Sequence, residues 1–236
     1  MLDRFWIAPA LTAAVLTVSY GVGFLFYGNA LTVFTADWNA LDLTTYACYL
    51  ALFFSLFRHR GDYATKTEKR NFALFCFFAL SAFLREAGIQ HWLASSDTTA
   101  FKIKFFTNPN NPLFEKVASA LCLTAVGAAF AYTMFLYLSP AFRGLFKKYA
   151  GSWTIITLLG CGALCKITDR IPSNLRKAGF FLPKDGLAQG IIETAEETLE
   201  TMLPVLAILA LAQFHKNKGS FFPPAKRVTE PPRSES

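Results

Sequence analysis

The chain has 236 residues, of which 53% are hydrophobic and only 17% are charged, and its formal net charge is +7. Soluble domains carry about 25% charged residues, so this composition excludes an ordinary water-soluble fold and indicates a chain dissolved in lipid. Basic residues beside membrane spans set topology, so the charge requires no nucleic-acid partner. Membrane lipids are the expected partners, and no sequence feature identifies a protein partner.

Six apolar segments are long enough to suggest membrane crossings, since a spanning helix needs roughly 20 mostly apolar residues. In chain order they cover residues 7–27, 41–57, 72–93, 117–138, 153–167 and 191–214. The sequence therefore predicts an all-α polytopic membrane helix bundle of about six spans. This bundle occupies residues 1–215, and the Pro-rich, charged residues 216–236 are expected to form a disordered basic tail.

The first segment could also be interpreted as a cleaved signal peptide, because Arg4 precedes it and Gly28-Asn29-Ala30 is a small-x-small tripeptide. Its apolar stretch is much longer than the roughly 7 to 15 residues of a signal peptide. An uncleaved first helix is the favoured interpretation.

Lys and Arg side chains resist translocation, so they mark the cytoplasmic loops. Most of the 23 lie before the first segment, after the second, after the fourth and in the tail. Both termini are therefore predicted to be cytoplasmic, in a multi-pass protein of a bacterial-type inner (plasma) membrane. His59 and His215 fall at the cytoplasmic boundary and are expected to be solvated.

Five cysteines lie inside the predicted spans and none lies in a loop, which argues against a disulfide framework. Cys161 and Cys165 have the i, i+4 spacing of some metal ligands. Buried cysteine is common as a small hydrophobic residue, so packing is the favoured interpretation.

The sixth segment contains four glutamates, and this is the strongest polar feature of the chain. At about 100° per residue they occupy one stripe roughly 100° wide, formed by Glu193, Glu196, Glu197 and Glu200. The stripe runs directly into an apolar stretch, so Glu197 and Glu200 are expected within the membrane. Like charges this close demand a cation or bound protons.

Two further polar clusters are predicted on the same outer side of the membrane. Lys166, Asp169 and Arg170 share one helical face and are expected to pair with the glutamates. The other cluster contains Arg85, Glu86, Gln90 and His91. On a regular helix His91 lies about 140° from Glu86, so both enter one site only if the helix loosens near Gly88.

The outer loop after the third segment alternates Lys102 and Lys104 with apolar side chains. This mixture suits the head-group region of a bilayer. A loop lying on the membrane surface is the favoured interpretation, and a roof over a substrate site is the alternative.

Three classes of function remain open. The first is a metal-dependent hydrolase of a lipid or lipid-linked substrate, whose divalent metal would lower the pKa of a bound water. Its catalytic residues would be Glu86, His91 and Glu197, with Glu193 as a further metal ligand. Lys102, Lys104 and Arg170 would bind an anionic head group, and a polar network would support the site through Arg85, Lys166, Asp169, Glu196 and Glu200.

The second class is a non-catalytic membrane scaffold or assembly subunit, in which buried ion pairs specify helix register. The third is a proton- or cation-coupled transporter, for which Pro204 supplies a helix kink. No catalytic sequence motif decides among these three classes.

Overall fold

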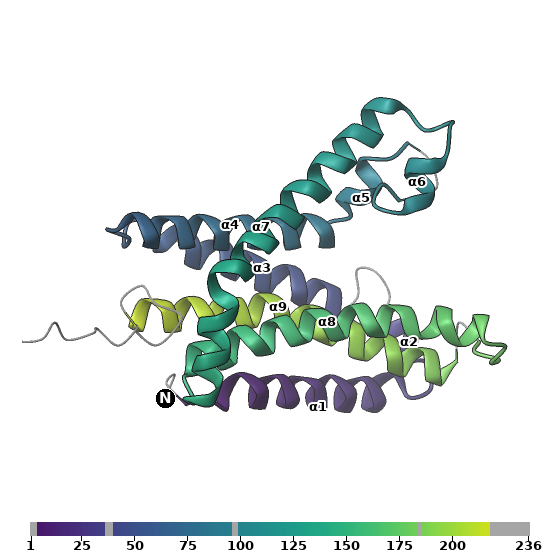
Figure 1. The fold of residues 1–236 in the computed structure, drawn as a ribbon. Coiled ribbons are helices and arrows are strands. Elements are labelled where there is room, and N and C mark those ends of the chain that lie inside the picture. Colours follow the sequence, from purple (N-terminus) through teal and green to yellow (C-terminus); the bar gives the residue numbers. More distant parts are fainter. Residues whose placement is uncertain (1–3, 36–39, 96–98, 184–185, 218–236) are drawn as a thin grey trace, which may run out of the picture.

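The computed structural model describes residues 4–35, 40–95, 99–183 and 186–217. For Gln90, within the second range, it describes the backbone alone. These residues form helices and no strand (Figure 1). The helices are α1 (Ile7–Tyr27), α2 (Leu31–Phe34), α3 (Ala40–Arg58), α4 (Lys66–Glu86), α5 (Ile89–Trp92), α6 (Ile103–Thr107), α7 (Leu113–Phe146), α8 (Ala150–Lys177) and α9 (Leu187–Lys216). The all-α polytopic architecture is confirmed. Of the predicted tail, only Lys216 and Asn217 lie within the described residues.

Five of these helices are long and apolar enough to cross a membrane: α1, α3, α7, α8 and α9. They correspond to the first, second, fourth, fifth and sixth predicted spans. Helix α8 extends to Lys177, well past the predicted end at residue 167, because its charged second half remains helical beyond the apolar stretch.

Helix α4 corresponds to the third predicted span but differs from it at both ends. Its start is fixed by a capping box in which the Thr65 hydroxyl accepts from the Glu68 backbone N–H and the Glu68 carboxylate accepts from the Thr65 N–H. Its end is fixed by Gly88, whose φ of +76° breaks the helix before α5 begins. Six of the 21 residues of α4 are charged, and α4 is not among the five helices named above.

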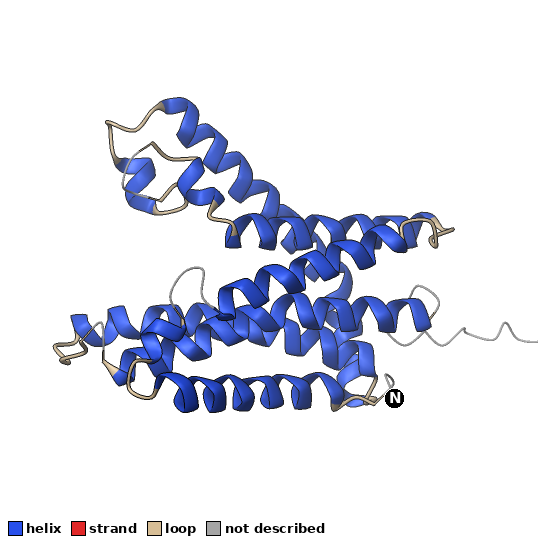
Figure 2. Cartoon of the chain, turned by 180° about the vertical axis from the view of Figure 1, so that it is seen from behind, coloured by secondary structure: helices blue, strands red, loops and turns tan. Residues whose placement is uncertain are grey.

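Helix α9 lies at the centre of the bundle and packs against α8, α3, α1 and α2 (Figures 1 and 2). Two thirds of the residues in the most apolar stretch of α9 are buried, whereas no residue in the most apolar stretch of α7 is buried. The exposed apolar side chains of α7 suit contact with lipid, since lipid tails solvate them as well as a protein core does. Buried polar groups therefore concentrate on α9.

A glycine allows the closest approach between α9 and a neighbour. A Cβ built on Gly190 would lie 2.6 Å from Leu31 Cβ and 3.0 Å from the Thr32 backbone nitrogen of α2. Small residues at such positions let helix backbones approach closely in membranes. Gly190 therefore fixes the separation of α2 and α9.

We expect Gly190→Ala to destabilise the protein by about 1 to 3 kcal/mol, the usual cost of overpacking. Gly160→Ala is the matched control, because a Cβ at Gly160 meets nothing within 4 Å and alanine has the better helix propensity. Thermal unfolding in detergent measures both variants. Equal stability of the two would contradict the close-packing argument.

The charge distribution also predicts whether α4 crosses the membrane. If both termini are cytoplasmic, the chain must cross the membrane an even number of times. Helix α4 must then cross it as well, in addition to the five more apolar helices. A cysteine introduced at Gly61 should then react with an impermeant maleimide from the cytoplasmic side, and one at Thr107 from the opposite side. Labelling of both from one side would show that α4 does not cross; the protein without added cysteines is the control.

Candidate functional site

Three carboxylates gather where α4 meets α9. One oxygen from each of Glu86, Glu197 and Glu200 lies within 4.8 Å of the others. Glu86 ends α4, and the two α9 glutamates are three residues apart on the face turned toward it. The structure thus joins Glu86 and Glu197 of the expected catalytic set with Glu200 of the expected supporting network.

Arg85 supplies the positive charge of this cluster. Its guanidinium donates to the Glu200 carboxylate and lies 3.7 Å from the Glu86 carboxylate. Glu200 is buried whereas the Arg85 side chain is 38% exposed, so the ion pair lies at the edge of the helix packing. One guanidinium cannot neutralise three ionised carboxylates, so the cluster must also hold protons or a cation.

Backbone groups add to the polarity of the site. Pro204 lies inside α9 and has no N–H with which to bond the Glu200 carbonyl four residues earlier. On the other side of the cluster, the Tyr46 hydroxyl of α3 donates to the Glu86 carbonyl at 3.1 Å. Glu86 and Glu200 therefore bring carbonyl as well as carboxylate oxygens to this region.

An apolar cavity of about 330 Å³ begins one helical turn from the carboxylates. Its wall includes Tyr49 of α3, Ala82 of α4 and Leu203 of α9, which are three or four residues from Tyr46, Glu86 and Glu200 respectively. Residues of α7 and α8 complete the wall. The three glutamates do not line the cavity, and the carboxylate cluster lies about one helical turn beyond this part of its wall.

The other end of the cavity also has polar side chains. Asn71 and Tyr137 line it and hydrogen-bond to each other, and Arg70 donates to the Tyr137 hydroxyl at 3.0 Å. The cavity is therefore an apolar space with polar Asn71 and Tyr137 at this end and the carboxylate cluster about one helical turn beyond the other.

The other two glutamates of the stripe have different partners, Glu193 through its carboxylate and Glu196 through its backbone carbonyl. Glu193 accepts from the Gln189 amide at 2.6 Å and from the Thr35 hydroxyl at 3.2 Å. The Glu196 carbonyl accepts from the Cys165 thiol of α8. Because α9 is surrounded by helices, a stripe that is continuous in sequence is divided among different neighbours.

The residues of the second predicted polar cluster, on α8, form ion pairs with one another. Asp169 lies 3.9 Å from the Lys166 ammonium and 3.8 Å from the Arg170 guanidinium. All three side chains are exposed. Among the described residues, they form no ion pair with a glutamate of α9, in contrast to the expectation from the sequence.

His91, Lys102 and Lys104 lie in a separate part of the chain. All three are exposed, His91 on α5 and the two lysines at the start of α6. Figure 1 shows α5 and α6 beside the first turns of α7, away from the α8 and α9 pair. The helix does break at Gly88, but the break leaves exposed His91 outside the carboxylate cluster.

The cysteines behave as the packing interpretation predicts. All five are free thiols, and Cys161 and Cys165 are buried in the core that joins α1, α8 and α9.

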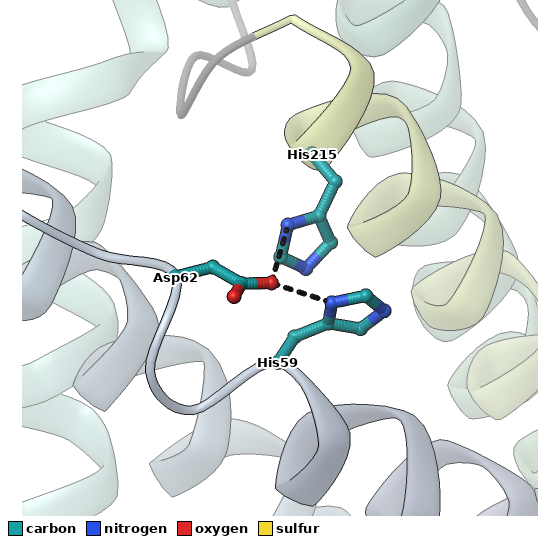
Figure 3. Close-up of side chains that lie close together, drawn as sticks. All are labelled: His59, Asp62 and His215. Carbon is teal, nitrogen blue, oxygen red and sulfur yellow. Dashed lines mark hydrogen bonds and ion pairs between the residues drawn. The ribbon is translucent and has the colours of Figure 1, made fainter.

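A second group of ligand side chains lies at the opposite end of α9, where sequence reasoning expected solvated residues. His59, Asp62 and His215 bring one ligand atom each within 4.8 Å of the others (Figure 3). His215 is only 20% exposed in its side chain, so its predicted solvation is wrong. The sequence contained a clue to this meeting, because His59 and His215 were both predicted to lie at the same membrane boundary.

No family model, curated protein or solved structure matches this chain. The functional argument therefore rests on the geometry of the chain itself.

We expect Arg85→Met to destabilise the protein by on the order of 3 kcal/mol, because it leaves a buried carboxylate unpaired. The matched control is Arg170→Met, which removes an exposed pair worth about 0 to 1 kcal/mol. The double variant Arg85→Met, Glu200→Gln should recover most of the loss. Unfolding in detergent measures all three, and equal losses for the two single variants would contradict a buried ion pair.

Proposed function

We propose that this membrane protein is a metal-dependent hydrolase of a lipid or lipid-linked substrate, located in an inner (plasma) membrane with its site toward the outer side. The observation that carries the proposal is the cluster of Glu86, Glu197 and Glu200 near an apolar cavity, with one guanidinium in contact with two of the three carboxylates. The excess negative charge favours a cation, and the cavity suits an acyl or prenyl chain.

The donor set indicates which cation to expect. Carboxylate and carbonyl oxygens suit Mg²⁺ and Mn²⁺, whereas imidazole also suits Zn²⁺ and Fe²⁺. Because His91 lies outside the cluster, the proposal rests on oxygen ligands alone and favours Mg²⁺ or Mn²⁺. Glu86 and Glu197 would bind the ion, while Glu200 is held by Arg85.

The chemistry would be attack by water on an ester or phosphoester. A bound divalent cation would acidify the water. One carboxylate of the cluster, Glu86 or Glu197, would accept the water proton as the oxygen bonds to the carbonyl carbon or phosphorus. The ester bond then breaks, and the same proton passes to the departing alkoxide. Placement beside the cavity would bring a chain-linked ester within reach of the water.

A scaffold function is the second candidate, and one observation favours it. Helix α4 packs mainly against α3, α5 and α7, so the Arg85 and Glu200 ion pair is a principal polar link from α4 to the central helix. Such a pair can specify helix register without any chemistry. A proton-coupled transporter is the third candidate, since partly neutralised intramembrane carboxylates also serve as proton carriers.

The test compares wild-type protein with Glu86→Gln and Glu197→Gln, which keep side-chain size and remove charge. The control is Glu115→Gln, an acidic residue of α7 outside the cluster that accepts from the Ser95 N–H. Each purified protein is titrated with Mn²⁺ and incubated with a polar lipid extract, and hydrolysis products are identified by mass spectrometry. We expect wild type and the control to bind one ion and release product, and both cluster variants to lose at least 100-fold in rate.

Three outcomes separate the candidates. Loss of metal and product in folded, monodisperse cluster variants supports the hydrolase. Absence of bound metal and of product in wild type, together with poor assembly of the variants, would favour the scaffold. Proton release on raising the pH, lost in Glu197→Gln without any bound metal, would favour the transporter.

A further inference from the structure

The turn between α3 and α4 meets the last turn of α9 through three side chains. His59 and Asp62 come from the turn, and His215 comes from the helix (Figure 3). One Asp62 carboxylate oxygen lies 2.7 Å from His59 Nδ1 and 3.9 Å from His215 Nδ1. Two imidazole nitrogens and a carboxylate oxygen thus converge from two elements far apart in sequence.

We propose that His59, Asp62 and His215 form a binding site for a divalent transition-metal ion of the zinc class. Two imidazoles and one carboxylate are an established donor set for Zn²⁺ and related ions. This site is independent of the proposed hydrolase, because it lies about 22 Å along α9 from Glu200 at 1.5 Å per residue.

The observed spacing is close to that of a loaded site. Zinc bonds nitrogen and oxygen at about 2.0 to 2.2 Å, which separates tetrahedral ligand atoms by about 3.4 Å. The observed distances of 2.7 and 3.9 Å lie on either side of this value. Shifts of under about 1 Å from that ideal spacing would suffice, and Asp62 and His59 are exposed enough to make them.

A hydrogen-bonded neighbour orients one of the ligands. The Tyr63 hydroxyl lies 3.1 Å from His215 Nε2. If Nε2 carries the hydrogen and donates it to Tyr63, the lone pair of Nδ1 faces Asp62. Metal-binding histidines usually have such an outer partner, which fixes the ring and its tautomer. Tyr63 is itself buried, with its ring against Phe72 and Phe214.

The imidazole rings are close together, with centroids 3.9 Å apart. Both rings therefore offer a ligand nitrogen to the same small space, within 4.8 Å of each other and of an Asp62 carboxylate oxygen. Arg60 is the nearby cation in sequence, but its guanidinium lies over the Phe57 ring at 4.2 Å. The exposed sides of His59 and Asp62 leave water access for the remaining coordination position.

A metal at this position would join the α3 to α4 turn to the end of the central helix. Metal binding to the folded state alone stabilises that state by mass action. We therefore expect bound Zn²⁺ to raise the unfolding temperature as well as to occupy the site.

The experiment uses full-length protein with a tag that contains no histidine, in the Glu86→Gln, Glu197→Gln background. That background removes the two carboxylates proposed to bind the other ion, so failure here is distinguishable from failure of the hydrolase proposal. Zn²⁺ affinity is measured by competition with a chromophoric chelator. We expect one ion per chain, a loss of about 100-fold or more for His59→Ala and His215→Ala, and about tenfold for Tyr63→Phe.

His91→Ala is the matched control, since it removes the remaining histidine of the chain, which lies exposed on α5. It should retain both the affinity and the Zn²⁺-dependent rise in unfolding temperature. Asp62→Asn is the milder variant if an alanine substitution prevents folding, and it should weaken binding at least tenfold. Absence of stoichiometric Zn²⁺, or unchanged affinity in the His59, Asp62 and His215 variants, would overturn the proposal.

Discussion

The central position of α9 is the constraint on which the rest of the structure depends. This helix packs against four others, yet its first half is rich in glutamate and threonine. A polar group removed from water must find a partner, because an unpaired one costs several kcal/mol in hydrocarbon. Several neighbours of α9 accordingly present a polar group to the residue that faces them.

Those matches explain the architecture better than hydrophobic contact alone. Helix α4 contributes Arg85 to Glu200, and α3 contributes Thr45, whose hydroxyl meets that of Thr201 at 2.6 Å. Helix α2 approaches closely enough at Gly190 for the adjacent Thr35 to bond Glu193. Lipid provides little hydrophobic drive for helix association, so these polar contacts and close approaches specify which helices meet.

The two ends of α9 have different chemistry. The carboxylate cluster offers oxygen donors beside an apolar cavity, and the opposite end offers imidazole nitrogens beside an exposed turn. Because metals differ in the ligands they prefer, the carboxylate cluster suits Mg²⁺ or Mn²⁺ and the imidazole group suits Zn²⁺.

The sequence by itself determined the all-α membrane class, five of the expected spans and the four-glutamate stripe, because apolar run length and helical periodicity are local properties. It also identified Glu86 as a partner of Glu197. Only the tertiary structure decided how the stripe is divided, since that depends on which helices surround α9. It likewise decided that exposed His91 lies outside the cluster, because Gly88 redirects the chain, and that His59 and His215 meet, because the ends of α3 and α9 lie together.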